Sequence, residues 1–161
     1  PQPAAETSAP PAPAQAAQAT PPPAAHQEAS HDAHAATPAD AVPLPPQGQR
    51  WATDVPLRNG MARIRQAVGA LEHGVHGHLD AAQQQAAAKQ VDAAVADMIA
   101  NCKLVPEADA SLHALLATFI AGAAAAREGR FGQPQLEAMQ GALAEYPRRF
   151  DDPSWNAPTP D

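Results

Sequence analysis

The stretch LRNGMARIRQAVGALEHGV, residues 57–75, places its apolar side chains at alternating steps of four and three residues. They are Leu57, Met61, Ile64, Val68, Leu71 and Val75. This spacing puts a stripe of apolar side chains on one side of an α-helix, as the core of a helical bundle requires. Asp54 is placed to cap the helix and Pro56 is tolerated in its first turn, so we predict a helix over 56–78.

Three further stretches carry a helical pattern of apolar side chains, over residues 80–102, 107–128 and 134–146. Asp80 is placed to cap the second helix, and Pro106 prevents its continuation. Gly129 ends the third helix, and Pro147 breaks the fourth. Because the connections are short, consecutive helices are expected to be antiparallel neighbours. The sequence therefore predicts an all-α fold, an antiparallel up-down-up-down four-helix bundle.

Composition divides the chain into unlike parts. Residues 1–49 contain 16 Ala and 12 Pro but no Lys or Arg, which is typical of a disordered, partly extended arm. We predict that the bundle occupies 50–155 and that a disordered tail follows over 156–161. An Ala/Pro-rich arm on a chain that begins at Pro1 is typical of an exported bacterial protein whose signal peptide has been removed. We therefore expect a periplasmic protein, either free or tethered to a membrane through the arm.

Charge and motifs exclude several classes of function. The formal net charge is −7, and no basic patch is large enough to hold nucleic acid. No apolar run approaches the roughly 20 residues of a membrane span. The chain also lacks a nucleophile elbow, a phosphate-binding glycine loop and a convincing Ser-His-Asp arrangement. We therefore do not expect an enzyme.

Soft metal ligands are expected to meet at one end of the predicted bundle. Cys102, the only cysteine, ends the second helix close to the starts of the first and third helices. Met61 and Met98 lie about one turn from that end, and His113 lies about two turns from it. Thiolate, thioether and imidazole ligands together select copper. We predict that Met61, Cys102 and His113, with Met98 in reserve, bind Cu(I) for sequestration or for transfer to a periplasmic partner protein, with electron transfer as a variant.

The stretch EHGVHGH, residues 72–78, is a second candidate metal site. His73 and His76 are one helical turn apart, and two glycines leave the backbone free to bring His78 beside them. Such a cluster suits Cu(II), Ni(II) or Zn(II). It lies at the opposite end of the bundle from the first site. The alternative interpretation is a polar, frayed helix end with solvated histidines.

The segment LRNGM, residues 57–61, followed by Ile64 and Val68, resembles the first helix of the soluble periplasmic cytochrome b family. In that family a Met near the start of the first helix and a His at the end of the fourth bind the haem iron. The resemblance implies a periplasmic four-helix bundle over 57–150 with Met61 as a haem ligand. Pro147 stands where the family has its histidine. A haem-binding bundle that uses another second ligand is therefore an alternative function.

Three segments also resemble a family of small, largely uncharacterised exported bacterial proteins: NCKL at 101–104, ADASLH at 108–113 and HGVHGH at 73–78. That resemblance implies no activity. A metal-free structural or interaction module is the remaining alternative. In that case Cys102 is a buried small apolar side chain, or it joins two chains of a homodimer through a disulfide.

Overall fold

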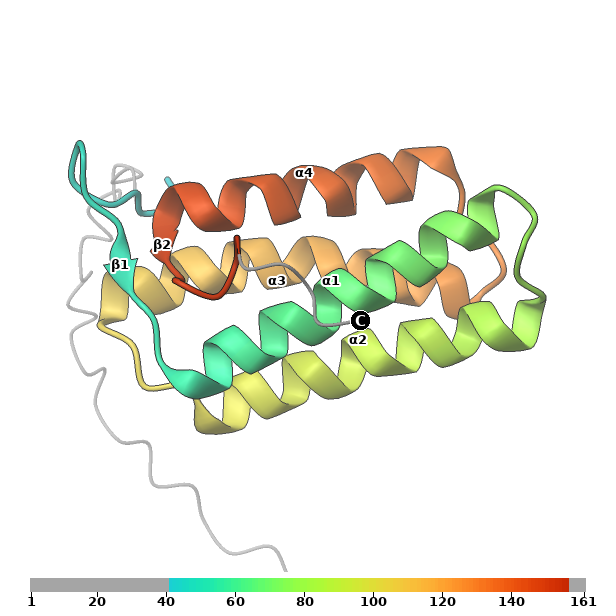
Figure 1. Ribbon diagram of the computed structural model, residues 1–161, viewed down its shortest axis with the longest axis horizontal. Coiled ribbons are helices and arrows are strands. Elements are labelled where there is room, and N and C mark those ends of the chain that lie inside the picture. Colours follow the sequence, from blue (N-terminus) through green and yellow to red (C-terminus); the bar gives the residue numbers. More distant parts are fainter. Residues whose placement is uncertain (1–40, 157–161) are drawn as a thin grey trace, which may run out of the picture. The chain divides into compact units, whose positions relative to one another are not determined.

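The structure, a computed structural model, describes residues 41–156. The chain divides into two units, 1–36 and 37–161, and the described residues all belong to the second. Figure 1 shows its elements, which are β1 (Trp51–Ala52), α1 (Val55–Val75), α2 (Ala81–Asn101), α3 (Pro106–Arg127), α4 (Gln133–Arg149) and β2 (Phe150–Asp151). The predicted all-α four-helix fold is confirmed. Residues 1–40 of the predicted arm and 157–161 of the predicted tail lie outside the described residues.

Consecutive helices are neighbours, and α1 also contacts α4. The helices approach closely because many of the buried side chains are alanines. The buried alanines of the core are Ala67, Ala87, Ala88, Ala94, Ala108, Ala123, Ala126 and Ala142. Two buried glycines allow still closer contact, with the Met98 side chain lying over Gly60 and that of Met139 over Gly122.

The predicted caps of the first two helices are confirmed. The Asp54 carboxylate accepts the Leu57 N–H at 2.9 Å, and Asp80 and Gln83 form a reciprocal capping box at the start of α2. Gly129 follows α3 with a φ of +68°, a left-handed conformation that glycine adopts without strain. Local sequence therefore sets these helix ends.

The predicted helix break at Pro147 is wrong, because α4 continues to Arg149. A proline removes one backbone N–H from the helix, but here the loss falls in the last turn. The Phe150 N–H still bonds to the Tyr146 carbonyl, and both aromatic side chains are fully buried. Burial of these two rings holds the last turn in helical conformation despite the proline.

The short strands β1 and β2 were not predicted from the sequence. They pair in parallel, with Trp51 opposite Phe150, and so join the chain entering the bundle to the chain leaving it. Two residues are too few to show the alternation that marks a strand. Aromatic packing reinforces the join, since the ring centroids of Trp51 and Phe150 lie 5.6 Å apart and those of Tyr146 and Trp155 lie 4.7 Å apart.

Among the described residues, α3 is the one helix long and apolar enough to cross a membrane by length and composition. The core helix of a bundle passes the same test, so the expectation that no segment spans a membrane stays a prediction. Half of the most apolar window of α3 is buried within the bundle, as is typical of a core helix.

Candidate functional site

The structure places the four predicted soft ligands in different environments. Met61 and Met98 are 0% and 1% exposed in the core. His113 lies on the outer surface of α3, where its side chain is 52% exposed and its Nδ1 lies 2.9 Å from the Asp109 carbonyl oxygen. The imidazole therefore faces solvent, whereas the thioethers are buried.

Cys102 is half-buried at the end of α2, where the Asp54 carboxylate contributes to the high pKa of its thiol. The same carboxylate accepts the Leu57 N–H at 2.9 Å and the Lys103 N–H at 2.6 Å. Asp54 thus joins the start of α1 to the end of α2. Burial raises the pKa of the Cys102 thiol to about 12, and the carboxylates of Asp54 and Asp109 add to this effect. The thiol is protonated at neutral pH, so a metal ion would have to displace its proton.

This environment predicts an unreactive cysteine. We expect Cys102 in the folded chain to react with iodoacetamide at about pH 8 at least roughly 100-fold more slowly than in the guanidinium-unfolded chain, because the thiolate is the reacting form. The rate is measured by mass spectrometry of the alkylated protein. Asp54→Asn, which removes the nearest negative charge, should accelerate the reaction. Equal rates in the folded and unfolded chains would contradict the protonated thiol.

The end of α1 builds the second candidate site. The His78 N–H donates to the His73 carbonyl at 2.9 Å, and the Gly77 N–H donates to the Gly74 carbonyl at 3.0 Å. Gly77 has a φ of +78°. These features define a Schellman motif, which brings together the side chains of the two residues joined by its longer hydrogen bond. Here those residues are His73 and His78.

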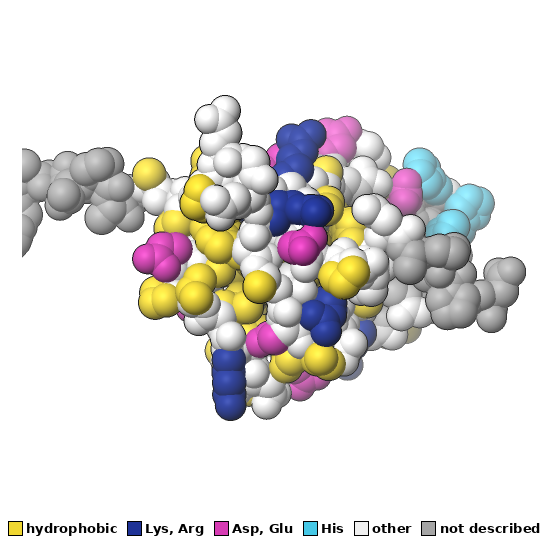
Figure 2. Space-filling view, turned by 60° about the vertical axis from the view of Figure 1, so that its left-hand side comes forward, with side chains coloured by type: hydrophobic (Ala, Val, Ile, Leu, Met, Phe, Trp, Pro, Cys, Tyr) yellow, Lys and Arg dark blue, Asp and Glu magenta, His cyan; other side chains and the backbone are white. Residues whose placement is uncertain are grey.

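The imidazole rings of His73 and His78 lie with their centroids 6.4 Å apart and at 65° to each other. Both side chains are exposed, as is that of His76, which caps the helix. Figure 2 shows the cyan histidine side chains gathered at one edge of the molecule. Within the predicted cluster of His73, His76 and His78, the structure places the rings of His73 and His78 side by side. The local signal for this contact is Gly77, two residues after the helix.

No group of three or more His, Cys, Asp or Glu side chains within residues 41–156 is placed to hold a metal ion. The two rings are therefore a pair of ligands and not a complete site. Glu72, next to His73, and Asp80, whose carboxylate caps α2, are the nearest acids in the sequence.

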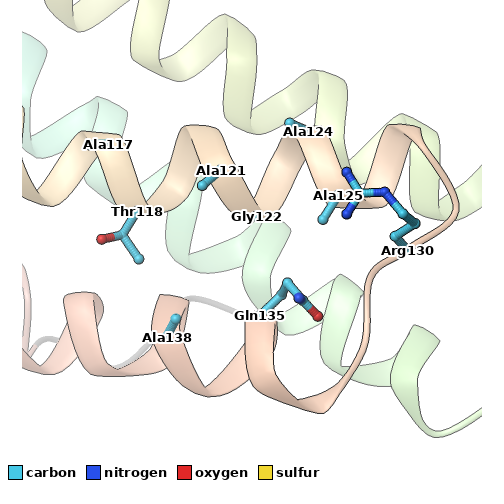
Figure 3. A pocket seen from close by; sticks show the side chains of 9 residues that line it. All are labelled: Ala117, Thr118, Ala121, Gly122, Ala124, Ala125, Arg130, Gln135 and Ala138. Carbon is cyan, nitrogen blue, oxygen red and sulfur yellow. The ribbon is translucent and has the colours of Figure 1, made fainter.

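A shallow groove of about 490 Å³ runs between α3 and α4. Figure 3 shows that α3 lines one side mainly with alanines, while Gln135 and Ala138 of α4 line the other and Arg130 lies at one end. Small side chains and one guanidinium do not specify a ligand. We assign no function to this groove.

A buried hydrogen bond between Tyr146 and Asp152 was not predicted from the sequence. The Tyr146 hydroxyl donates to Asp152 Oδ2 at 3.1 Å, and the carboxylate also accepts the Ser154 N–H at 2.9 Å. Burial and the Asp152 carboxylate raise the pKa of Tyr146. Both partners are satisfied, so the pair secures the turn by which the chain leaves α4.

The residues of α4 do not supply the second haem ligand that the cytochrome resemblance implies. The helix contains no histidine, and Pro147 lies half-buried in its last turn. Met61, the implied first ligand, is fully buried in the core.

Comparison with known proteins finds no matching family model, no similar curated protein and no similar solved structure. Both family resemblances therefore stay predictions. The function of this chain is accordingly inferred from its own geometry.

Proposed function

We propose that this chain binds a divalent transition-metal ion, preferentially Cu(II), through the imidazoles of His73 and His78. The contact between the two exposed rings carries the proposal. Imidazole nitrogen is a good ligand for copper, nickel and zinc, and Cu(II) forms the most stable complexes of the divalent first-row ions. The Ala/Pro-rich composition of residues 1–49 supports placing this function in the periplasm.

Small movements of the rings suffice for binding. Metal–nitrogen bonds of about 2.0 Å would hold the two ring centroids roughly 4.5–5 Å apart, whether the imidazoles are neighbouring ligands of a square-planar Cu(II) site or of a tetrahedral one. The rings are 6.4 Å apart, and both are exposed and free to rotate about their side-chain bonds. Water completes the coordination that the two imidazoles leave open.

A Cu(I) site at Met61, Met98, Cys102 and His113 is the second candidate. One observation favours it: the Met98 side chain packs over Gly60, next to Met61 and one turn before Cys102. Two observations count against this Cu(I) site: the Cys102 thiol is protonated at neutral pH, and His113 lies on the outer surface of α3. The histidine pair is therefore the better candidate.

The proposal is tested by titrating the full chain with Cu(II) against a competing chelator such as glycine. We expect His73→Ala and His78→Ala each to weaken the tightest site at least about tenfold, since each removes one of two imidazole ligands. His113→Ala is the matched control, because it removes an exposed histidine elsewhere on the bundle. Unchanged affinity in either variant of the pair would exclude the site.

Gly77→Ala provides a test that keeps both imidazoles. An alanine at φ +78° is strained by about 1–2 kcal/mol, which disfavours the Schellman motif that holds the rings together. We expect weaker Cu(II) binding in this variant. The control is Gly69→Ala within α1, the helix that precedes Gly77, where an added Cβ meets nothing within 4 Å. Equal affinities in the two glycine variants would show that the motif does not organise the site.

A further inference from the structure

One chain supplies an incomplete set of ligands at the histidine pair. His73 and His78 provide two imidazoles, and no third His, Cys, Asp or Glu in the described part of the chain is placed to join them. Protein-bound Zn(II) in closed sites takes four ligands in tetrahedral arrangement. A second pair of imidazoles would complete such a site.

We propose that two copies of the chain share one divalent metal ion, each contributing His73 and His78. This inference rests on the proposed function. A twofold axis through the metal would place identical turns on either side of it and give the isologous contact of a symmetric dimer. The site is then complete only in the presence of the second copy.

The position of the pair suits such a contact. Figure 1 shows the α1–α2 turn at one end of the bundle, and the three histidines of this turn are exposed. The turn can therefore approach its counterpart on a second copy before other parts of the bundle collide.

Charge also favours a cation at this junction. Residues 66–88, which include the α1–α2 turn, contain no Lys or Arg. The same segment carries the acids Glu72 and Asp80. The α3–α4 turn lies at the same end, and its Arg127 and Arg130 form ion pairs with Asp92 and Glu128. Each chain has a net charge of −7, so two copies repel each other and a divalent cation offsets part of that repulsion.

The test measures the molar mass of the full chain by sedimentation velocity, with and without ZnCl2, in the presence of a reducing agent. Zinc is used because it undergoes no redox chemistry. We expect a monomer without metal, a doubled mass at half an equivalent of Zn(II), and return to monomer with EDTA. His73→Ala and His78→Ala should prevent the change in mass, whereas His113→Ala and Cys102→Ser should preserve it.

The outcomes separate this inference from the proposed function. Binding of one ion per chain through His73 and His78 without a change in mass would overturn the shared site and leave the proposed function standing. Absence of Zn(II) binding at the pair would overturn the shared site, and absence of Cu(II) binding as well would overturn the proposed function. A zinc-dependent dimer that survives both histidine substitutions would place the interface elsewhere and overturn the inference.

Discussion

Asp54→Ala should lower the free energy of unfolding by about 2–3 kcal/mol, because one carboxylate holds two separate parts of the backbone. Its Oδ1 caps α1 at the Leu57 N–H, and its Oδ2 accepts the Lys103 N–H, 49 residues farther along the chain. The substitution therefore removes a helix cap and also the link between α1 and the end of α2.

Asp80→Ala is the matched control, since Asp80 caps α2 but bonds only within its own capping box. Loss of such a cap costs about 1 kcal/mol. Urea unfolding followed by far-ultraviolet circular dichroism measures both variants, and equal losses would show that the bond to Lys103 contributes nothing. Asp54→Asn, which keeps one carbonyl oxygen as an acceptor, should fall between the wild type and Asp54→Ala.

Helices and their caps could be predicted because their causes lie within a few residues of sequence. The apolar spacing from Leu57 to Leu71 placed α1, and all five of the stripe residues in that interval are buried. Asp54 and Asp80 were identified as caps from position alone. These features depend on one helical turn and its flanking residues, so no knowledge of tertiary contacts was needed.

The remaining features depend on contacts between distant residues. Pro147 stays within α4 because Tyr146 and Phe150 are buried against the rest of the bundle, and no local rule contains that information. The high pKa of the Cys102 thiol comes from burial and from the Asp54 carboxylate, which lies 48 residues earlier, so it was not apparent from the sequence.

The candidate ligands also divide into those placed by local sequence and those whose position depends on distant contacts. His113 was expected to face inward with the methionines, but a position beside an apolar stripe does not settle the direction of a side chain. The contact of His73 with His78, in contrast, follows from a glycine two residues beyond the helix. The Schellman motif could have been predicted from Gly77, and with it the position of His78 beside His73.

The two ends of α1 therefore differ in the chemistry they offer. At its start, the Asp54 carboxylate already accepts two backbone N–H groups, and the half-buried Cys102 thiol has a pKa of about 12, so a metal ion would have to displace its proton. At its end, the imidazoles of His73 and His78 are exposed. This contrast is why the proposed metal site lies at the end of α1.

Gly60→Ala and Gly122→Ala should each destabilise the bundle, by about 1–2 kcal/mol, although alanine favours a helix more than glycine does. A Cβ at Gly60 would lie 2.3 Å from Met98 Cγ and 2.4 Å from Met98 Sδ, and a Cβ at Gly122 would lie 2.3 Å from Met139 Sδ. Both methionines are buried in a closely packed core, so their side chains cannot move away without displacing neighbours.

The matched controls are Gly69→Ala in α1 and Gly141→Ala in α4, where an added Cβ meets nothing within 4 Å. These variants should be more stable than the wild type by about 0.5–1 kcal/mol, because they lower the entropy of the unfolded chain without a steric cost.

A double-mutant cycle with Met98→Ala then isolates the contact at Gly60. Removing the methionine side chain makes room for the new methyl group, so the double variant should be at least about 1 kcal/mol more stable than the sum of the single losses predicts. If Gly60→Ala stabilised the chain as much as Gly69→Ala, the close packing of α1 against Met98 would be refuted.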